Sequence, residues 1–320
     1  MIAPLRLGIP SKGRLMEKTL GFFSEVGLDI ETGGGREYSV SATGIDGIDV
    51  VLLQAGEIPC SLESGAIHLG VTGEDLIREK LRDADGATTL VKSMGFGRAD
   101  LVVAVPKSWI DVETMADLDD AAATFRDLHG HAMRVATKYL TITRRFFREN
   151  GVAHYRLVES AGATEGTAAA GAAEIIVDIT SSGETLKSNH LKVLFDGTIL
   201  RSQAQLRASR NAKWTEPTLA TLNTLIDRIE ARFAARRRVI LHGCLDVGID
   251  GLEKELASVQ ASLVSIEGKL VTVGSRSDRA YAAAQILRDR GATHVDSSHP
   301  AMLYGAGAGE FQRVASTLKT

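Results

Sequence analysis

The chain has 320 residues, enough for one large domain or two to three ordinary ones. Its 37 Lys and Arg nearly balance its 40 Asp and Glu, giving a net charge of -3, which argues against a general nucleic-acid-binding protein because such proteins are strongly basic. The N-terminus lacks the apolar core of a signal peptide, and no run approaches the ~18 apolar residues of a membrane helix. We therefore expect a cytoplasmic protein with no membrane contact.

Short apolar runs alternate with helical stretches over the first half of the chain. The predicted strands are residues 5–10, 49–53, 67–71, 101–105, 134–136 and 174–179. The predicted helices are residues 16–26, 58–64, 74–81 and 142–150. This alternation predicts an α/β fold with parallel strands. The strand at 174–179 is apolar on both faces, as expected of a strand that is covered on both sides.

A long amphipathic helix is predicted from about residue 218 to 237, and the pattern changes after it. The elements predicted there are a strand at 239–244, a helix at 251–258, strands at 262–266 and 270–274, a helix at 278–290 and a strand at 293–297. Their order, β-α-β-β-α-β, is that of the ferredoxin-like unit. We therefore expect a separate C-terminal α+β domain, and we assign no structure to the tail after Pro300.

The segment richest in chemistry is residues 165–186, EGTAAAGAAEIIVDITSSGETL. A buried strand ends near Asp178, where ligands bind in open α/β sheets, and a loop of hydroxyl side chains leads into a helix. Hydroxyls and backbone N–H groups at a helix start can bind an anion, and Gly183 lets the backbone approach it closely. A phosphate held there beside a carboxylate suits a phosphorylated sugar. From residue types alone, a plain turn with Ser181 or Ser182 as helix cap is an equal alternative.

The order of Glu165, Gly171, Asp178, Ser182-Gly183 and Thr185-Leu186 closely resembles the signature of the ATP phosphoribosyltransferase family, which catalyses the first step of histidine biosynthesis. Other segments resemble this family in the same chain order: 10–15 (PSKGRL), 58–59 (IP), 65–75 (GAIHLGVTGED), 95–105 (GFGRADLVVAV) and 134–144 (RVATKYLTITR). His68 stands where the family usually has Asp. The resemblance covers roughly residues 5 to 215.

The resemblance implies a two-lobed, periplasmic-binding-protein-like catalytic region with its site in the cleft, followed by a ferredoxin-like (ACT-like) extension. We expect lobe I at 1–92 and 183–235, lobe II at 93–182, and a C-terminal regulatory or assembly domain at 236–320. In longer family members such a domain binds histidine as an inhibitor, whereas shorter members use a separate subunit resembling histidyl-tRNA synthetase. Both modes stay open here, within a homo-oligomer built from dimers.

The implied reaction transfers the 5-phosphoribosyl group from phosphoribosyl pyrophosphate to N1 of ATP, giving phosphoribosyl-ATP and pyrophosphate. Such a transfer needs no protein nucleophile, so the site has to provide positioning and charge stabilisation. Mg²⁺ is expected to be carried by the pyrophosphate of the substrate, because this ion keeps several waters and binds through phosphate oxygens. The two cysteines and the scattered histidines show no metal-ligand spacing, so we expect no metal site made of protein side chains.

The resemblance also assigns site residues. The catalytic set is Asp178, Lys12 and Arg14, with Asp178 on the ribose hydroxyls and the two cations on pyrophosphate or ATP phosphates. The residues expected to bind phosphoribosyl pyrophosphate are Asp178, Thr180, Ser181, Ser182, Gly183, Glu184 and Thr185. Those expected to bind ATP are Arg14, Thr72, Gly73, Glu74 and Arg98. Those expected to line the cleft are Thr137, Lys138 and Tyr139. For each cation taken alone, a solvated surface side chain is the alternative.

Two other functions stay open at this point. The same two-lobed fold serves non-catalytic small-molecule binding or sensor proteins, and the fold alone does not choose between them. The loop after Asp178 argues against that reading, because a binder of free amino acids needs no phosphate-binding loop. The second alternative is a phosphoribosyltransferase for another base. Segments 10–15 and 95–106 favour ATP over this alternative.

Overall fold

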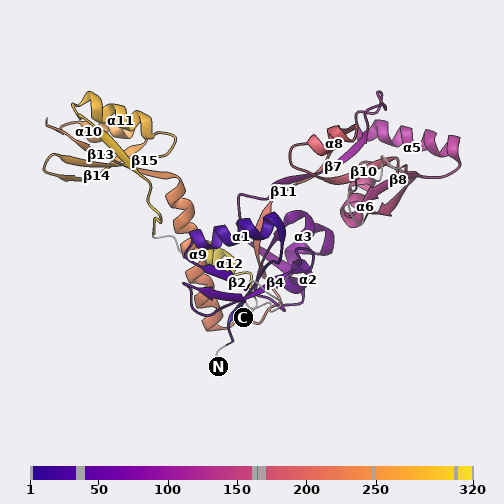
Figure 1. The fold of residues 1–320 in the computed structure, drawn as a ribbon, viewed down its shortest axis with the longest axis horizontal. Helices are drawn as coiled ribbons and strands as arrows, with labels where there is room; N and C mark the ends of the chain where they lie inside the picture. Colours follow the sequence, from indigo (N-terminus) through magenta and orange to yellow (C-terminus); the bar gives the residue numbers. More distant parts are fainter. Residues whose placement is uncertain are drawn as a thin grey trace.

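The computed structural model describes residues 3–33, 40–160, 164, 171–246, 249–305 and 309–318. Within these residues the strands form two five-stranded sheets, one four-stranded sheet and a two-stranded ribbon. Each larger sheet belongs to a separate body, and a long helix joins the first body to the third (Figure 1). Glu165 and most of the Ala/Gly run at 161–173 lie outside the described residues.

The first lobe is built on a sheet with the strand order β4-β1-β5-β12-β6. Its strands are β1 (Leu5–Pro10), β4 (Ile48–Leu53), β5 (Leu69–Gly73), β6 (Thr88–Ser93) and β12 (Ala204–Ser209), beside the ribbon of β2 (Asp29–Thr32) and β3 (Val40–Thr43). Strand β1 runs parallel to β4 and β5, whereas β12 runs antiparallel to β5 and β6. The parallel arrangement brings the carboxyl ends of β1 and β5 to the same edge of the sheet.

Helices cover both faces of this sheet. They are α1 (Gly13–Glu25), α2 (Ile58–Glu63), α3 (Glu74–Lys80), α4 (Ala84–Ala87) and α9 (Glu216–Arg236). On one face, Leu5, Leu7 and Ile9 of β1 are fully buried in a core that includes apolar residues of α1 and α9. On the other face, residues of α2 and α3 form a second cluster. Hydrophobic burial on both faces explains the nearly continuous apolar runs of the parallel strands.

The second lobe has the strand order β11-β7-β10-β8-β9. Its elements are β7 (Ala99–Pro106), α5 (Met115–His129), β8 (Met133–Thr137), α6 (Leu140–Glu149), β9 (Tyr155–Glu159), β10 (Ile175–Thr180), α8 (Glu184–Ser188) and β11 (Leu191–Ser202). Successive residues of β10 point to opposite faces, so Ile175 and Val177 pack in the core beneath α5 and α6 while Ile176 packs with Leu186 of α8. Strand β8 is parallel to β9 and β10.

The structure differs from the predicted return of the chain to the first lobe near residue 182. Strand β11 pairs with β7, from Leu191 beside Pro106 to Ser202 beside Ala99, so α8 and β11 belong to the second lobe. The chain therefore returns at Gln203, between β11 and β12, rather than near residue 182. The first crossing, between the end of β6 at Ser93 and the start of β7, lies close to the predicted residue 92.

The C-terminal sheet has the order β14-β15-β13-β16, with all its pairs antiparallel. Its elements are β13 (Arg238–Cys244), α10 (Leu252–Ser258), β14 (Ala261–Glu267), β15 (Leu270–Arg276), α11 (Ala280–Asp289) and β16 (Val295–Ser298). This is the β-α-β-β-α-β order that the sequence predicts. Gly268 has φ +61 in the tight turn between β14 and β15, a conformation that glycine adopts without strain.

The tail does not belong to this C-terminal domain, although the prediction included it in 236–320. Helix α12 (Gly309–Ala315) lies against α9 and β6 of the first lobe (Figure 1). Val314 and Leu318 are buried in the first lobe's core, and the Arg210 Nε–H donates a hydrogen bond to the Thr317 carbonyl at 3.1 Å. Apolar burial therefore returns the end of the chain to the first lobe. Among the described helices, none combines the length and apolar content needed to cross a bilayer.

Candidate active site

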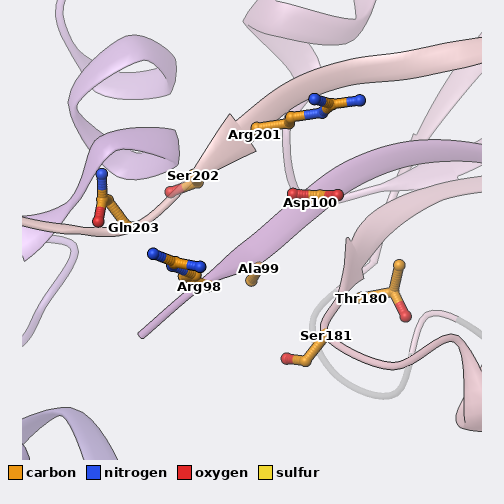
Figure 2. A pocket seen from close by; sticks show the side chains of 8 residues that line it. All are labelled: Arg98, Ala99, Asp100, Thr180, Ser181, Arg201, Ser202 and Gln203. Atoms are coloured by element: carbon orange, nitrogen blue, oxygen red, sulfur yellow. The ribbon is translucent and has the colours of Figure 1, made fainter. Parts of the chain in front are cut away.

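Two adjoining cavities lie between the lobes. The larger one, of about 760 Å³, is lined by first-lobe residues that include Arg14 and Asp75 and by second-lobe residues that include Lys138 and Ser181. The smaller one, of about 470 Å³, is lined by Arg98, Ala99, Asp100, Thr180, Ser181, Arg201, Ser202 and Gln203 (Figure 2). Three residues, Arg98, Ala99 and Ser181, line both cavities. Both volumes are in the range of small-molecule binding sites.

The ends of parallel strands supply the walls of the larger cavity. In the second lobe, Lys138 and Tyr139 directly follow β8, and Ser181 follows β10, the parallel neighbour of β8. In the first lobe, Arg14 follows β1 at the start of α1, and Asp75 follows β5 at the start of α3. The carboxyl ends of parallel strands are where ligands bind in open α/β sheets, so both sheets present this edge to the cleft.

Asp178 lies just behind this wall. Its side chain is nearly buried, and its Oδ1 lies 3.7 Å from the Lys138 ammonium. The same oxygen accepts the backbone N–H of Ile179 at 2.8 Å. The Lys138 ammonium also lies 5.3 Å from the centre of the Tyr139 ring, a cation–π distance. Lys138 thus connects the buried carboxylate to the cavity that it lines.

The loop after β10 is shaped by its own hydroxyls. Thr180 Oγ1 accepts the Gly183 N–H at 2.9 Å, and Ser182 Oγ accepts the Glu184 N–H at 3.4 Å. Gly183 has φ +75, and a Cβ built there would meet nothing within 4 Å, so the space beside it is open. Ser181 and Thr180 face the smaller cavity across from Arg98 and Arg201 (Figure 2). Ser182, Glu184 and Thr185 are exposed and, like Gly183, line neither cavity.

Asp75 is a buried carboxylate on the first-lobe side of the cleft. Its Oδ2 accepts the Tyr139 hydroxyl at 2.7 Å, and its Oδ1 accepts the Ser202 hydroxyl at 2.7 Å. The Asp75 backbone N–H donates to Ser202 Oγ at 3.1 Å. Burial, together with the neighbouring Asp75 carboxylate, raises the pKa of Tyr139 well above its ordinary value. The phenol therefore stays protonated and donates its hydrogen bond across the cleft.

Known proteins match this chain over most of its length. The family described as ATP phosphoribosyltransferase matches residues 54–231. The chain belongs to the ATP phosphoribosyltransferase family. An ATP phosphoribosyltransferase from Rhodopseudomonas palustris (strain BisB18) is 47% identical to this chain, and the match covers 92% of each of the two chains. One from Nitrobacter winogradskyi is 45% identical, and the match covers 100% of each of the two chains. A chain of the solved ATP phosphoribosyl transferase (HisG:HisZ) complex from Thermotoga maritima is 25% identical with a TM-score of 0.55, covering 71% of this chain and 96% of that one.

The likeness to the Thermotoga chain confirms the predicted α/β fold class of this family member, and more than a quarter of the chain lies outside that match. Among the residues predicted for ATP and the cleft, the structure brings Arg14, Gly73, Arg98, Lys138 and Tyr139 to the larger cavity. Lys12 is exposed immediately before α1, two residues from Arg14.

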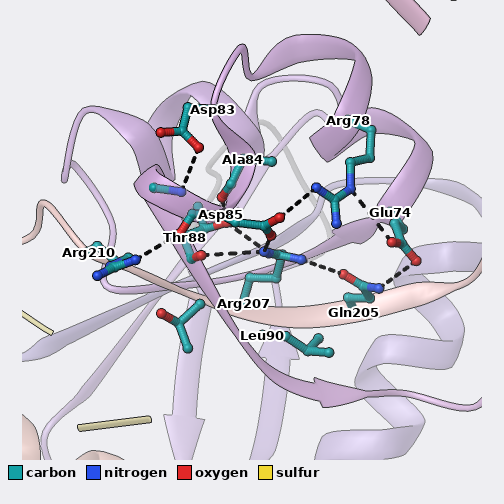
Figure 3. A network of polar contacts seen from close by, with 12 residues as sticks. Glu74, Arg78, Asp83, Ala84, Asp85, Thr88, Leu90, Gln205, Arg207 and Arg210 are labelled. Carbon is teal, nitrogen blue, oxygen red and sulfur yellow. Dashed lines mark hydrogen bonds and ion pairs between the residues drawn. The ribbon is translucent and has the colours of Figure 1, made fainter. Parts of the chain in front are cut away.

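Three other predicted residues point away from the cavities of this family member. The Thr72 hydroxyl is buried and donates to the Ala55 carbonyl at 2.9 Å. Glu74 accepts from Gln205 at 2.8 Å and pairs with Arg78, within a polar network around the buried Arg207 (Figure 3). The Thr137 hydroxyl is buried and accepts the Tyr139 N–H at 2.9 Å. Each of them shapes a turn that carries a cavity residue.

Among the polar and charged residues that line the cavities, sequence reasoning missed six: Lys18, Asp75, Asp100, Arg201, Ser202 and Gln203. Lys18 lies one helical turn after Arg14 on α1, a spacing that places both cations on one helix face and could have found it. Asp75 follows Glu74 in the same motif, and only the packing of α3 decides which carboxylate faces the cleft. Arg201 of β11 lies in register with Asp100 of β7, and the apolar pattern of the sequence does not reveal this strand pairing.

Proposed function

We propose that the cleft between the lobes is where the chain transfers the 5-phosphoribosyl group from phosphoribosyl pyrophosphate to N1 of ATP, giving phosphoribosyl-ATP and pyrophosphate. This is the first step of histidine biosynthesis and the activity of the family to which the chain belongs. The structural observation that carries the assignment is the pair of adjoining cavities with a common wall at Arg98 and Ser181. A two-substrate transfer needs two ligands side by side, and a sensor of one small molecule does not.

The loop after β10 is assigned to the ribosyl donor. Its hydroxyls and backbone bind the 5′-phosphate, and the open space beside Gly183 leaves room for that group. The bond from the Gly183 N–H to Thr180 Oγ1 fixes the loop before the ligand arrives, which lowers the ordering cost of binding. Asp178 binds the ribose hydroxyls with Lys138 at its side. The residues in this group are Asp178, Thr180, Ser181, Ser182, Gly183, Glu184 and Thr185.

The larger cavity is assigned to ATP. Arg14, Lys18 and Arg98 line it and supply positive charge for the triphosphate and for the departing pyrophosphate, with Lys12 beside them. Gly73 forms part of its wall, whereas Thr72 and Glu74 act through the turn that they shape. Phe96 and Leu76, also in the wall, offer apolar surface to the adenine ring.

The reaction is a displacement at C1 of the ribose, with inversion as N1 attacks opposite the leaving pyrophosphate. The protein's part is to hold the two reacting atoms in line and to stabilise the charge that develops on the leaving group. Mg²⁺ belongs on the pyrophosphate oxygens of the substrate, where it neutralises charge when bound. Among the described residues, no group of three His, Cys, Asp or Glu is placed to hold a metal, and the cations and hydroxyls of the cleft fit a metal–phosphate substrate.

We further propose that the chain works in the cytoplasm as a homo-oligomer built from dimers, with the C-terminal sheet as its regulatory or assembly domain. Full-length coverage of the Nitrobacter relative includes this domain, whereas the Thermotoga chain of a two-component complex matches only 71% of this chain. The difference favours inhibition by histidine bound to this chain over control by a separate subunit resembling histidyl-tRNA synthetase.

The test is to assay the purified chain for phosphoribosyl-ATP and pyrophosphate with ATP, phosphoribosyl pyrophosphate and Mg²⁺. We expect turnover that needs both substrates. Asp178→Ala should lower kcat/KM for phosphoribosyl pyrophosphate by about 100-fold or more, because misplacing the ribose by about 1 Å costs that much. The matched control is Asp196→Ala, since the Asp196 carboxylate accepts the Met115 N–H at 2.8 Å away from the cavities. Binding without turnover, or full activity in Asp178→Ala, contradicts the proposal.

A further inference from the structure

Helix α3 of the first lobe presents two carboxylates, one helical turn apart, to the second lobe. The Glu79 carboxylate accepts the backbone N–H of Thr141 at 3.0 and 3.1 Å and that of Ile142 at 3.0 Å. Asp75 accepts the Tyr139 hydroxyl at 2.7 Å. Residues four apart lie on one face of a helix, so both carboxylates meet the same turn between β8 and α6. These bonds all cross from one lobe to the other.

The bonds to Glu79 act as a helix cap supplied from another lobe. The first N–H groups of a helix have no partner inside it, and a side chain just before the helix usually accepts one of them. Tyr139 occupies that position before α6 and makes no such bond. In contrast, α5 of the same lobe is capped by its own Thr114 and Asp117. The start of α6 therefore has this cap only when the two lobes stand at the separation seen here.

The Glu79 cap is connected to the reacting groups through one short turn. Lys138 is the first residue of this turn, directly after β8, and its ammonium nitrogen lies 3.7 Å from Asp178 Oδ1. Tyr139 is held by Asp75, which Ser202 fixes in turn at the point where β11 leaves the second lobe. Any shift of the start of α6 relative to α3 therefore moves Lys138 relative to Arg14 and Arg98 on the opposite wall.

We propose that Glu79 is a positioning residue for the transfer reaction: by capping α6 across the cleft, it sets the separation of the two lobes and aligns the donor side with the ATP side. This inference rests on the proposed function. Glu79 itself lines neither cavity, and its effect passes through the backbone of Thr141 and Ile142 to Lys138. The carboxylate also lies at the positive end of the α6 dipole, which favours a charged acceptor over a neutral one.

The test compares Glu79→Ala and Glu79→Gln with Asp119→Ala. Asp119 of α5 accepts the Ala153 N–H at 2.7 Å inside the second lobe, so its loss removes a similar bond that does not cross the cleft. Glu79→Ala should lower kcat/KM for phosphoribosyl pyrophosphate about 10- to 100-fold, since a misplacement of about 1 Å costs roughly the upper value. Glu79→Gln keeps one acceptor oxygen and should recover most of this loss. Asp119→Ala should keep kcat/KM within about twofold of the wild-type value, although its melting temperature should decrease about as much as that of Glu79→Ala.

Hydrogen exchange of the first turn of α6 gives a second readout that needs no turnover. Glu79→Ala should speed exchange at Thr141 and Ile142, and Asp119→Ala should leave it unchanged. Equal kinetic losses in Glu79→Ala and Asp119→Ala, or unchanged exchange in Glu79→Ala, overturn the inference. A wild-type chain that makes no phosphoribosyl-ATP contradicts the proposed function instead, and exchange then still decides whether Glu79 joins the lobes.

Discussion

Two turns that each join a strand to a helix, one in each lobe, border the cleft, and they differ in what their polar atoms contact. The turn at Gly73 joins β5 to α3, and the turn at Gly183 joins β10 to α8. Around Gly73, the side chains of Thr72, Glu74 and Asp75 are all hydrogen-bonded to other parts of the protein. A Cβ added at Gly73 would lie 2.2 Å from Asp75 Oδ1, whereas one added at Gly183 meets nothing within 4 Å.

The difference shows that a glycine-containing turn from a strand to a helix can either form a fixed wall of the cleft or leave its outer side open. A polar atom whose hydrogen bond is to another protein group has to give up that bond to bind a substrate in its place. The buried group that loses its partner is then left unpaired, which costs free energy. The Gly73 turn is therefore a fixed wall that also joins the lobes through Asp75 and Tyr139. The Gly183 turn is internally braced but open on its outer side. Substitution at Gly183 should therefore affect catalysis more than substitution at Gly73, whereas substitution of His68, which lies outside both turns, should affect stability alone.

Gly183→Val should have the largest effect on catalysis. A β-branched residue at φ +75 costs about 1–3 kcal/mol, so the loop should shift and misplace a phosphate bound as proposed. We expect a loss of about 100-fold or more in kcat/KM for phosphoribosyl pyrophosphate. The decrease in melting temperature should be modest because the new side chain enters open space. Wild-type kinetics in this variant would show that the phosphate binds elsewhere.

Gly73→Ala should act through Asp75. Gly73 has φ −72, which any residue adopts, so the backbone is not strained. The new Cβ displaces the Asp75 carboxylate from Ser202 and Tyr139, which should lower the free energy of unfolding by about 1–3 kcal/mol. We expect a decrease of about tenfold in kcat/KM from the altered wall. Urea unfolding and steady-state kinetics measure both effects, with Gly21→Ala, a helical position with open space, as control. Unchanged stability would mean that Asp75 tolerates the displacement.

His68 should affect the pH dependence of stability without changing either turn. Its Nδ1 accepts the Arg6 N–H at 3.0 Å and its Nε2 lies 3.2 Å from the Lys213 carbonyl. Burial lowers the pKa of His68 below its value in the unfolded chain. The stability that it contributes is therefore complete above about pH 6.5 and is lost as the pH falls below that value. The free energy of unfolding, measured from pH 8 to 5, should fall less steeply with decreasing pH in His68→Gln than in the wild type. Identical pH dependence in the two proteins would contradict this.

Much of the fold could be predicted from apolar periodicity. The buried strand predicted at 174–179 is β10 at Ile175–Thr180, and the long helix predicted at 218–237 is α9 at Glu216–Arg236. Strand β11 was missed because its pattern is interrupted by Asp196 and Gly197, where its register against β7 shifts. That omission also misplaced the return of the chain, since pairing between distant strands is not a local property of the sequence.

The site was partly predictable for a similar reason. Arg14 and Ser181 follow predicted strands, and Arg98 lies just before the predicted strand at 101–105, so the ends of strands fix where these residues lie. Asp75 and Arg201 face the cavities because of how α3 packs and how β11 pairs, which depend on the approach of the two lobes. Resemblance alone assigned Glu74 and Thr137, whose side chains serve the turns beside them.

The return of the tail makes the C-terminal sheet an insertion in the first lobe rather than an appendage. The chain leaves the lobe through α9, and it rejoins α9 where the Leu303 N–H donates to the Ala231 carbonyl at 3.0 Å. After that contact, Val314 and Leu318 complete the first lobe's core. A rotation of the inserted domain is therefore passed to the first lobe at two points. Truncation after α9 would remove part of that core as well, so a clean deletion has to splice across residues 238–300 and keep α12.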